Sequence, residues 1–144
     1  SLDLYGFKQV GKAFADIVKE DCAKGEMPKD AILVGNNWFP LANYDYYSAS
    51  PLGMKSFGLG TLSQIHKFAW TNRANDCYNI GMNAYFITDS RYFQDPEPAF
   101  SKYFESIEAC DTVEIMRGGK VAKLAFIYRL KNMQALPDDP LFFW

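Results

Sequence analysis

Residues 31–47 read AILVGNNWFPLANYDYY, and this stretch decides the fold that the sequence predicts. Its first four residues are apolar with almost no polar alternation, which is typical of a strand covered on both faces. A turn of Gly35, Asn36 and Asn37 follows, and Pro40 then stands where the first turn of a helix tolerates proline. This order places polar groups at the carboxyl end of a strand, where open α/β sheets bind ligands.

Further helices and strands are predicted on both sides of this stretch. Apolar residues at helical spacing predict a helix over residues 7–22. Strands are expected at residues 55–59 and 83–88, and a short helix at residues 99–106. Residues 61–70 have helical spacing in part, but the segment is too short to decide between helix and loop.

A β-hairpin near the end of the chain completes the predicted fold. Strands at 112–116 and 121–130 flank Arg-Gly-Gly-Lys, and a Gly-Gly pair supplies the positive φ angles of a two-residue turn. Alternate apolar residues of the second strand share one face: Leu124, Phe126, Tyr128 and Leu130. The order of elements predicts an α/β three-layer sandwich. Its sheet is expected to be mostly parallel and Rossmann-like, with the antiparallel hairpin at one edge.

The composition fits one globular domain over residues 1–144. Hydrophobic residues make up 49% of the chain and charged residues 22%, an ordinary mix for a domain with a core. The net charge of -2 argues against nucleic-acid binding, since such surfaces are basic. Aromatic residues reach 17%, which indicates either a core built on large rings or an aromatic surface for a sugar, a lipid or a partner.

Two features of the chain bear on its location. It has no run of 18 apolar residues, so no transmembrane helix is expected within it, and no signal-peptide pattern stands at its start. The chain is therefore interpreted either as cytosolic or as a domain cut from a larger protein. The three cysteines, Cys22, Cys77 and Cys110, can form at most one disulfide and are interpreted as buried thiols, so they assign no compartment.

The sequence contains no recognisable catalytic or cofactor motif. GLGTLS at residues 58–63 begins like a dinucleotide-binding fingerprint but lacks its third glycine, so it is interpreted as a turn that ends a strand. His66 is the only histidine and has neither a nucleophile motif nor a cluster of metal ligands beside it. Asp45 shares a helical face with apolar residues, which favours a structural role for its carboxylate. We expect no catalytic residue, no metal and no cofactor.

Polar residues follow each of the three predicted parallel strands. Segments 35–37, 58–61 and 88–90 are expected to converge on one edge of the sheet and to offer amides, hydroxyls and one carboxylate. Directional polar groups beside flat aromatic rings suit sugar hydroxyls, although these residue types are also common in ordinary loops. The candidate substrate-binding residues are Asn36, Asn37, Trp38, Tyr44, His66 and Asp89.

The order of several short motifs resembles a known family. These motifs are YGF at 5–7, PKDAILV at 28–34, the aromatic positions 38, 46 and 47, QIHKFAW at 64–70, GMNAYFITD at 81–89 and the closing hairpin with YRLKN at 128–132. In this order they resemble the soluble C-terminal domain of bacterial membrane glycosyltransferases of the aminoarabinose-transferase and dolichyl-phosphate-mannose protein mannosyltransferase-like type. The resemblance covers roughly residues 5–134.

The resemblance implies a function that composition and spacing do not. It implies an accessory domain on the extracytoplasmic (periplasmic) face of the inner membrane, packed over the transmembrane part of its own parent chain. The domain would help to shape the site for a polyprenyl-phosphate sugar or a glycan acceptor. The acidic catalytic residues of such enzymes lie in the transmembrane part, so this domain alone is expected to be inactive. The alternatives are a stand-alone Rossmann-like enzyme that binds a sugar or nucleotide, and an interaction module.

Overall fold

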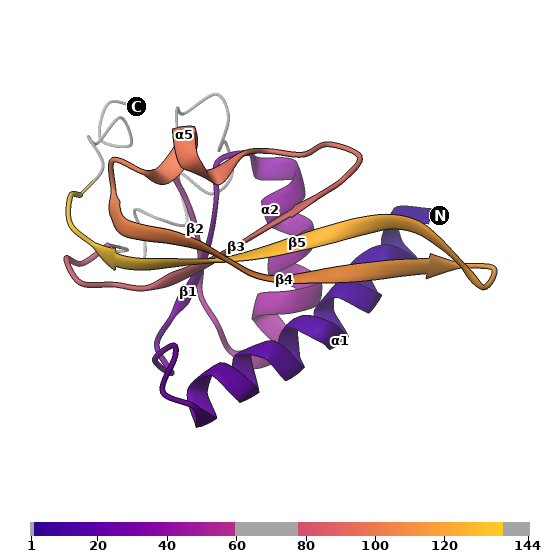
Figure 1. Ribbon diagram of the computed structural model, residues 1–144, viewed down its shortest axis with the longest axis horizontal. Coiled ribbons are helices and arrows are strands. Elements are labelled where there is room, and N and C mark those ends of the chain that lie inside the picture. Colours follow the sequence, from indigo (N-terminus) through magenta and orange to yellow (C-terminus); the bar gives the residue numbers. More distant parts are fainter. Residues whose placement is uncertain (1, 60–77, 137–144) are drawn as a thin grey trace.

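A computed structural model describes residues 2–59 and 78–136 (Figure 1). The predicted helix or loop at residues 61–70, together with His66 and Cys77, lies outside these ranges. The elements in chain order are α1 (Leu2–Ala23), β1 (Ile32–Gly35), α2 (Trp38–Tyr44), the π-helical turn η1 (Asp45–Ala49), the 3-10 turn η2 (Ser50–Leu52), β2 (Ser56–Gly58), β3 (Ala84–Asp89), α5 (Pro96–Phe100), β4 (Phe104–Arg117) and β5 (Lys120–Met133).

The five strands form one mixed sheet in the order β2-β1-β3-β5-β4. β1 lies parallel to β2 and to β3, but each of these pairings joins only three residue pairs. β5 lies antiparallel to β3 and to β4, over much longer stretches. The sheet is therefore mostly antiparallel, and the predicted mostly parallel, Rossmann-like sheet is wrong.

The reason for this error lies in the chain between β3 and the hairpin. A parallel return needs a crossover of a dozen or more residues, usually an α-helix. The helix found there, α5, has five residues and ends at Phe100, four residues before β4 begins. Of the expected helix at residues 99–106, the first two residues belong to α5, the next three form a turn, and the last three begin the 14-residue strand β4. β5 then docks antiparallel against β3.

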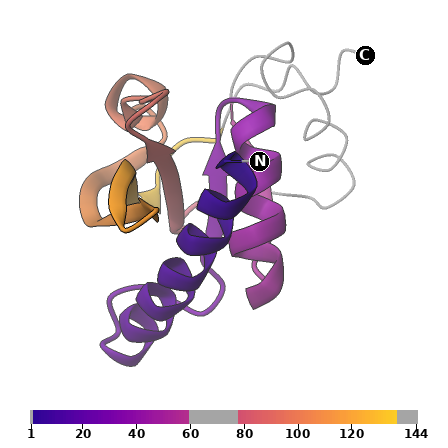
Figure 2. The same ribbon diagram turned by 90° about the vertical axis from the view of Figure 1, so that its right-hand side faces the viewer.

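The two longer helices lie together on one face of the sheet (Figure 2). Their apolar faces and the sheet enclose one core cluster, which includes Val10 and Phe14 of α1, Leu41 and Tyr44 of α2, and Tyr85 of β3. On the opposite face, a second cluster packs under α5. The predicted three-layer sandwich has helices on both faces of the sheet. Within the described ranges, one face has a full helical layer and the other has one short helix.

Close approach of two backbones fixes α2 against α1. A Cβ atom added to Gly11 would lie 2.1 Å from the carbonyl oxygen of Tyr47, far inside van der Waals contact. Glycine is therefore required at this point of α1, because it lets the helix touch the π-helical turn. Since η1 continues α2, this contact also sets where the aromatic residues of α2 lie.

The predicted hairpin is confirmed and is longer than expected. Gly118 and Gly119 join β4 to β5 with φ angles of 58° and 77°, as a two-residue turn requires. A register shift between Ala109 and Asp111 marks a bulge in β4. None of the helices in the described ranges is both long and apolar enough to cross a membrane.

Candidate functional site

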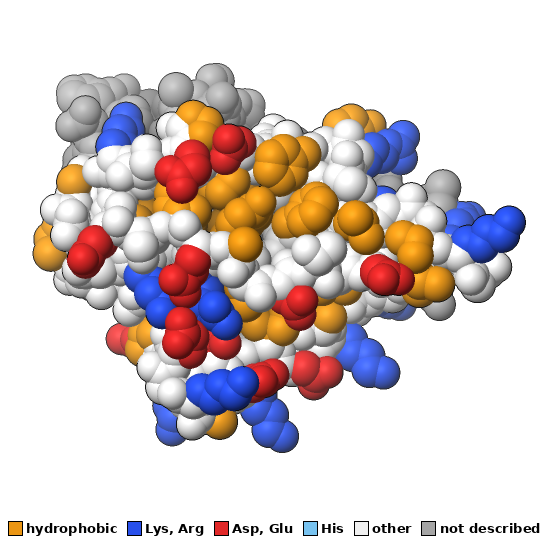
Figure 3. Space-filling view, viewed as in Figure 1, with side chains coloured by type: hydrophobic (Ala, Val, Ile, Leu, Met, Phe, Trp, Pro, Cys, Tyr) orange, Lys and Arg blue, Asp and Glu red, His pale blue; other side chains and the backbone are white. Residues whose placement is uncertain are grey.

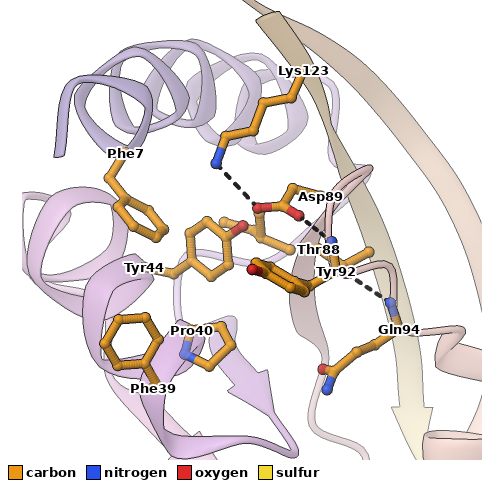
Figure 4. Close-up of a pocket in the computed structure, with 10 residues that line it drawn as sticks. Phe7, Phe39, Pro40, Tyr44, Thr88, Asp89, Tyr92, Gln94 and Lys123 are labelled. Carbon is orange, nitrogen blue, oxygen red and sulfur yellow. Dashed lines mark hydrogen bonds and ion pairs between the residues drawn. The ribbon is translucent and has the colours of Figure 1, made fainter. Parts of the chain in front are cut away.

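The parallel strands β1 and β3 end side by side, and a pocket lies at their carboxyl ends. Val34 of β1 pairs with Phe86 of β3, so the turn after β1 and the loop after β3 face the same edge of the sheet. The pocket has a volume of about 70 Å³ and is drawn in Figure 4. Its lining consists of Phe7, Phe39, Pro40, Tyr44, Ile87, Thr88, Asp89, Tyr92, Gln94 and Lys123.

Aromatic rings make up much of the pocket wall. Phe7 of α1 packs edge-to-face against Tyr44 of α2, with 5.1 Å between ring centroids. Phe39 and Tyr92 are 58% and 70% exposed; in Figure 4, Phe39 lies beside Pro40 and Tyr92 lies near Tyr44 and Thr88. Exposed rings beside a pocket of this kind provide flat apolar faces on which a ligand ring can pack.

Asp89, at the end of β3, uses its carboxylate to shape the loop that follows. Oδ1 accepts hydrogen bonds from the backbone N–H groups of Arg91, at 3.1 Å, and Tyr92, at 2.9 Å. Oδ2 lies 3.4 Å from the ammonium nitrogen of Lys123 on β5. These contacts fix the loop backbone that carries the exposed Tyr92, so Asp89 has a clear structural role besides any contact with a ligand.

Neighbouring side chains hold the rest of this loop against the sheet. The buried Thr88 accepts a hydrogen bond at its Oγ1 from the backbone N–H of Gln94, at 3.0 Å. Ser90 exchanges two bonds with Leu124: its N–H donates to the Leu124 carbonyl, and its hydroxyl oxygen accepts from the Leu124 N–H. The loop wall of the pocket is therefore pinned to β3 and to β5.

A smaller adjoining cavity of about 10 Å³ lies against the turn after β1. It is lined by Asn36 and Asn37 and shares Pro40, Tyr44 and Gln94 with the larger pocket. The side-chain oxygen of Asn36 is buried here and accepts no hydrogen bond among the described residues. A buried acceptor without a donor costs about 1–3 kcal/mol, so the site holds a polar group that a ligand could satisfy.

Asn37 precedes α2 as its N-cap, yet its side chain makes no capping hydrogen bond. Asparagine at this position normally stabilises a helix by accepting a bond from the second or third helical N–H. Here the backbone is extended, with φ of -138°, but the amide is not used in that way. Both asparagines of the turn are thus polar groups that the helix and sheet leave unused.

Tyr44 is the buried polar aromatic residue between the two cavities. Burial, with a smaller contribution from the Asp89 carboxylate, raises the pKa of the Tyr44 hydroxyl well above its ordinary value. The hydroxyl therefore stays protonated at physiological pH and can serve as a neutral hydrogen-bond donor. It is not suited to act as a base.

The predicted site residues are only partly brought together. Tyr44 and Asp89 line the larger pocket, while Asn36, Asn37 and Tyr44 line the smaller one. Trp38 is the first residue of α2, and His66 lies outside the described residues. The other converging segment, 58–61, is described only to residue 59, where the N–H of Leu59 bonds the Gly35 carbonyl.

Sequence reasoning missed several lining residues, because they come from distant parts of the chain. Phe7 belongs to the predicted first helix, far from the strand ends in the sequence, and Lys123 lies 34 positions from Asp89. Phe39 and Tyr92 could have been identified from the sequence, because both are large aromatic residues a few positions after the end of a predicted strand. Asp45, for which capping or a structural salt bridge is the expected role, accepts a hydrogen bond from the Ser56 hydroxyl at 2.6 Å.

Within residues 2–59 and 78–136, no group of three or more histidine, cysteine or acidic side chains is arranged to hold a metal ion. Comparisons with known protein families, with curated proteins and with solved structures found no match. The fold and the geometry of the site are therefore the ground on which a function is proposed.

Proposed function

We propose that this chain is the accessory domain of a membrane glycosyltransferase that uses a polyprenyl-phosphate sugar. We further propose that the pocket at the ends of β1 and β3 contacts the sugar part of the donor or of the acceptor. Two things support this proposal: the order of motifs along the chain, and the chemistry of the pocket lining. The domain would act beside the transmembrane part of its parent, on the periplasmic face of the inner membrane.

One observation carries the proposal for the site, namely the unpaired oxygen of Asn36 in the small cavity that adjoins the aromatic-lined pocket and shares Tyr44 with it. This oxygen is buried against the cavity of about 10 Å³, so a sugar hydroxyl that donates to it requires the turn after β1 to open locally and in return supplies the donor that the described residues lack. The rings of Phe39 and Tyr92 can pack against the apolar face of the same sugar. Directional polar groups with flat apolar walls are typical of small-molecule sites in general and suit sugars in particular.

The pocket is proposed to bind and position, while the chemistry takes place elsewhere in the parent protein. Its hydroxyl groups belong to Thr88, which bonds the loop backbone, and to the two tyrosines. The Tyr44 hydroxyl has a raised pKa and stays protonated. We therefore expect the isolated domain to show no turnover with lipid-phosphate sugars.

The experiment that tests this function uses the gene and the full-length protein. The proposal requires a run of hydrophobic spans encoded before Ser1, with acidic residues in an extracytoplasmic loop. Asn37→Ala in the full-length enzyme should lower transfer about tenfold, the effect of losing one hydrogen bond to a ligand. Asn43→Ala is the matched control, since this amide only bonds the Phe39 carbonyl within α2. A gene that starts near Ser1, or equal effects of both variants, would refute the proposal.

A further inference from the structure

The outer edge of β4 is a second surface with a chemical character of its own. β4 stands last in the sheet order and pairs only with β5, so its outer edge has no neighbouring strand among the described residues. The strand is 14 residues long, whereas β2 at the opposite edge has three. A long unpaired edge presents a row of backbone N–H and C=O groups to which another strand can bind.

At one end of this edge, a side chain of α1 forms the backbone hydrogen bonds that a neighbouring strand would form. The amide of Gln9 on α1 donates to the Met116 carbonyl at 2.9 Å and accepts from the Met116 N–H at 2.8 Å. Farther along, among the described residues, the only side chain that bonds the β4 backbone is Asp111, which accepts from the N–H of its neighbour Thr112. Residues 104–114 therefore form the open part of the edge, about 35 Å long at the usual rise per residue.

The open edge is acidic. Its four acidic residues are Glu105, Glu108, Asp111 and Glu114, and Figure 3 shows acidic side chains spaced along the hairpin, with basic ones gathered at its tip. Glu108 is compensated by Arg129, at 3.5 Å, and Lys131, at 3.3 Å. The other three are exposed, and no salt bridge joins them to any lysine or arginine in the described ranges.

This charge decides which kind of strand the edge can accept. Two copies of β4 side by side would bring carboxylates opposite carboxylates, and like charges on paired strands are destabilising. A strand that carries lysine or arginine would instead place cations beside uncompensated carboxylates, of which Asp111 and Glu114 lie on opposite faces of the sheet. We propose that residues 104–114 bind an extended, basic segment of a partner protein by strand addition.

The proposal rests on different residues from the sugar site. The pocket lies at the ends of β1 and β3, whereas β3 and β5 separate the acidic edge on β4 from β1. The two sites can therefore be tested, and can fail, separately.

A titration with a designed peptide tests the strand addition. The probe is the acetylated, amidated peptide KVKVKVK, added to the ¹⁵N-labelled protein and followed by amide chemical shifts and hydrogen exchange. We expect shifts confined to β4 and its neighbours, with exchange of β4 amides slowed at least fivefold. Two N-methylated versions, blocked at odd or at even positions, separate backbone pairing from charge attraction. One of the two should lose at least tenfold in affinity.

Charge variants of the protein provide the second half of the test. The double variant Glu105→Gln, Glu114→Gln should bind the basic peptide at least fivefold more weakly, and its amide spectrum reports whether the fold is kept. If this variant does not fold, the acidic peptide EVEVEVE on the unchanged protein gives the same comparison and should not bind. Equal binding of both N-methylated peptides, shifts spread over the whole surface, or self-association of the protein through β4 would overturn the proposal.

Discussion

Two regions of the molecule treat their polar side chains in opposite ways. In the antiparallel half, Arg129 of β5 donates to both carboxylate oxygens of Asp21 on α1, at 2.9 and 2.8 Å. In the parallel half, the buried oxygen of Asn36 has no donor among the described residues, and Asn37 does not cap its helix. The Asp21 cluster uses its polar groups to hold the fold together, whereas the turn after β1 leaves polar groups that a ligand can use. This contrast is confined to the turn, since Ser56 of β2 and Asp89 of β3 are hydrogen-bonded.

The buried carboxylate of Asp21 is hydrogen-bonded and paired with a charge of opposite sign. Asp21 is only 3% exposed, and the Tyr85 hydroxyl donates a third hydrogen bond to it at 2.7 Å. Glu26 and Lys131 extend the cluster toward the surface. A buried charge is tolerated when it is paired and hydrogen-bonded in this way, and removing one partner then leaves an uncompensated charge.

Breaking the buried pair is expected to have the largest effect on stability. Arg129→Met should lower the free energy of unfolding by about 3–5 kcal/mol, because Asp21 would remain buried without its cation. Urea denaturation measures the loss. Lys131→Met is the control, since its ion pairs are more exposed and worth about 1 kcal/mol or less. A loss of under 1 kcal/mol for Arg129→Met would mean that the cluster does not anchor α1 to the hairpin.

Adding a methyl group at Gly11, where α1 touches η1, should cause the next largest loss of stability. Gly11→Ala is expected to cost about 1–3 kcal/mol, because its Cβ would overlap a backbone carbonyl that cannot rotate away. Gly6→Ala on the same helix is the matched control. Its Cβ would meet a methyl group of Ile115 at 3.3 Å and the Lys123 side chain at 3.5 Å, with no backbone atom among its nearest neighbours, and alanine favours a helix. Thermal unfolding compares the two, and equal midpoints would contradict the close packing described for Gly11.

The confirmed predictions depend on local sequence signals, whereas the missed features depend on contacts between distant parts of the chain. The periodicity of α1 and the Gly-Gly turn are local signals, and both predictions are confirmed. The placement of the hairpin beside β3 depends on contacts far apart in sequence, and so does the Lys123–Asp89 pair. At the site, the residue types at the strand ends predicted the location, whereas the walls contributed by α1 and β5 could not be read from the local sequence.

Acid should weaken the antiparallel half through Asp21. Burial raises the pKa of Asp21, but hydrogen bonds from Arg129 and Tyr85 outweigh it, so the pKa lies below the ordinary value. A carboxyl group with a lowered pKa stabilises the folded state above its unfolded pKa of about 3.9 and loses this contribution as the pH falls below it. Unfolding free energies measured from pH 6 to pH 2 should therefore fall less steeply for Asp21→Asn than for the unchanged protein. A parallel slope would mean that Asp21 does not titrate in this way.

The smallest effects on stability are expected in the turn after β1. Asn37→Ala should change the free energy of unfolding by about 0.5 kcal/mol or less, and Asn36→Ala should leave it unchanged or raise it, because the described residues give neither side chain a stabilising hydrogen bond and the Asn36 oxygen is buried without a donor. Asp89→Ala, by contrast, should cost about 1–2 kcal/mol, since its carboxylate holds two loop amides and Lys123. Chemical denaturation of the three variants separates the groups. Similar losses for all three would place the asparagines among the structural residues.

Ligand binding at the strand ends is the central claim, and an NMR titration of the isolated domain tests it most directly. The probes are neutral methyl glycosides at millimolar concentration, added to the ¹⁵N-labelled protein. The account predicts amide shifts at residues 36–44 and 88–94, and a loss of these shifts in the Asn36→Ala variant, whose fold should be intact. Saturating glycoside without shifts in these two segments, or the same shifts in the variant, would contradict it.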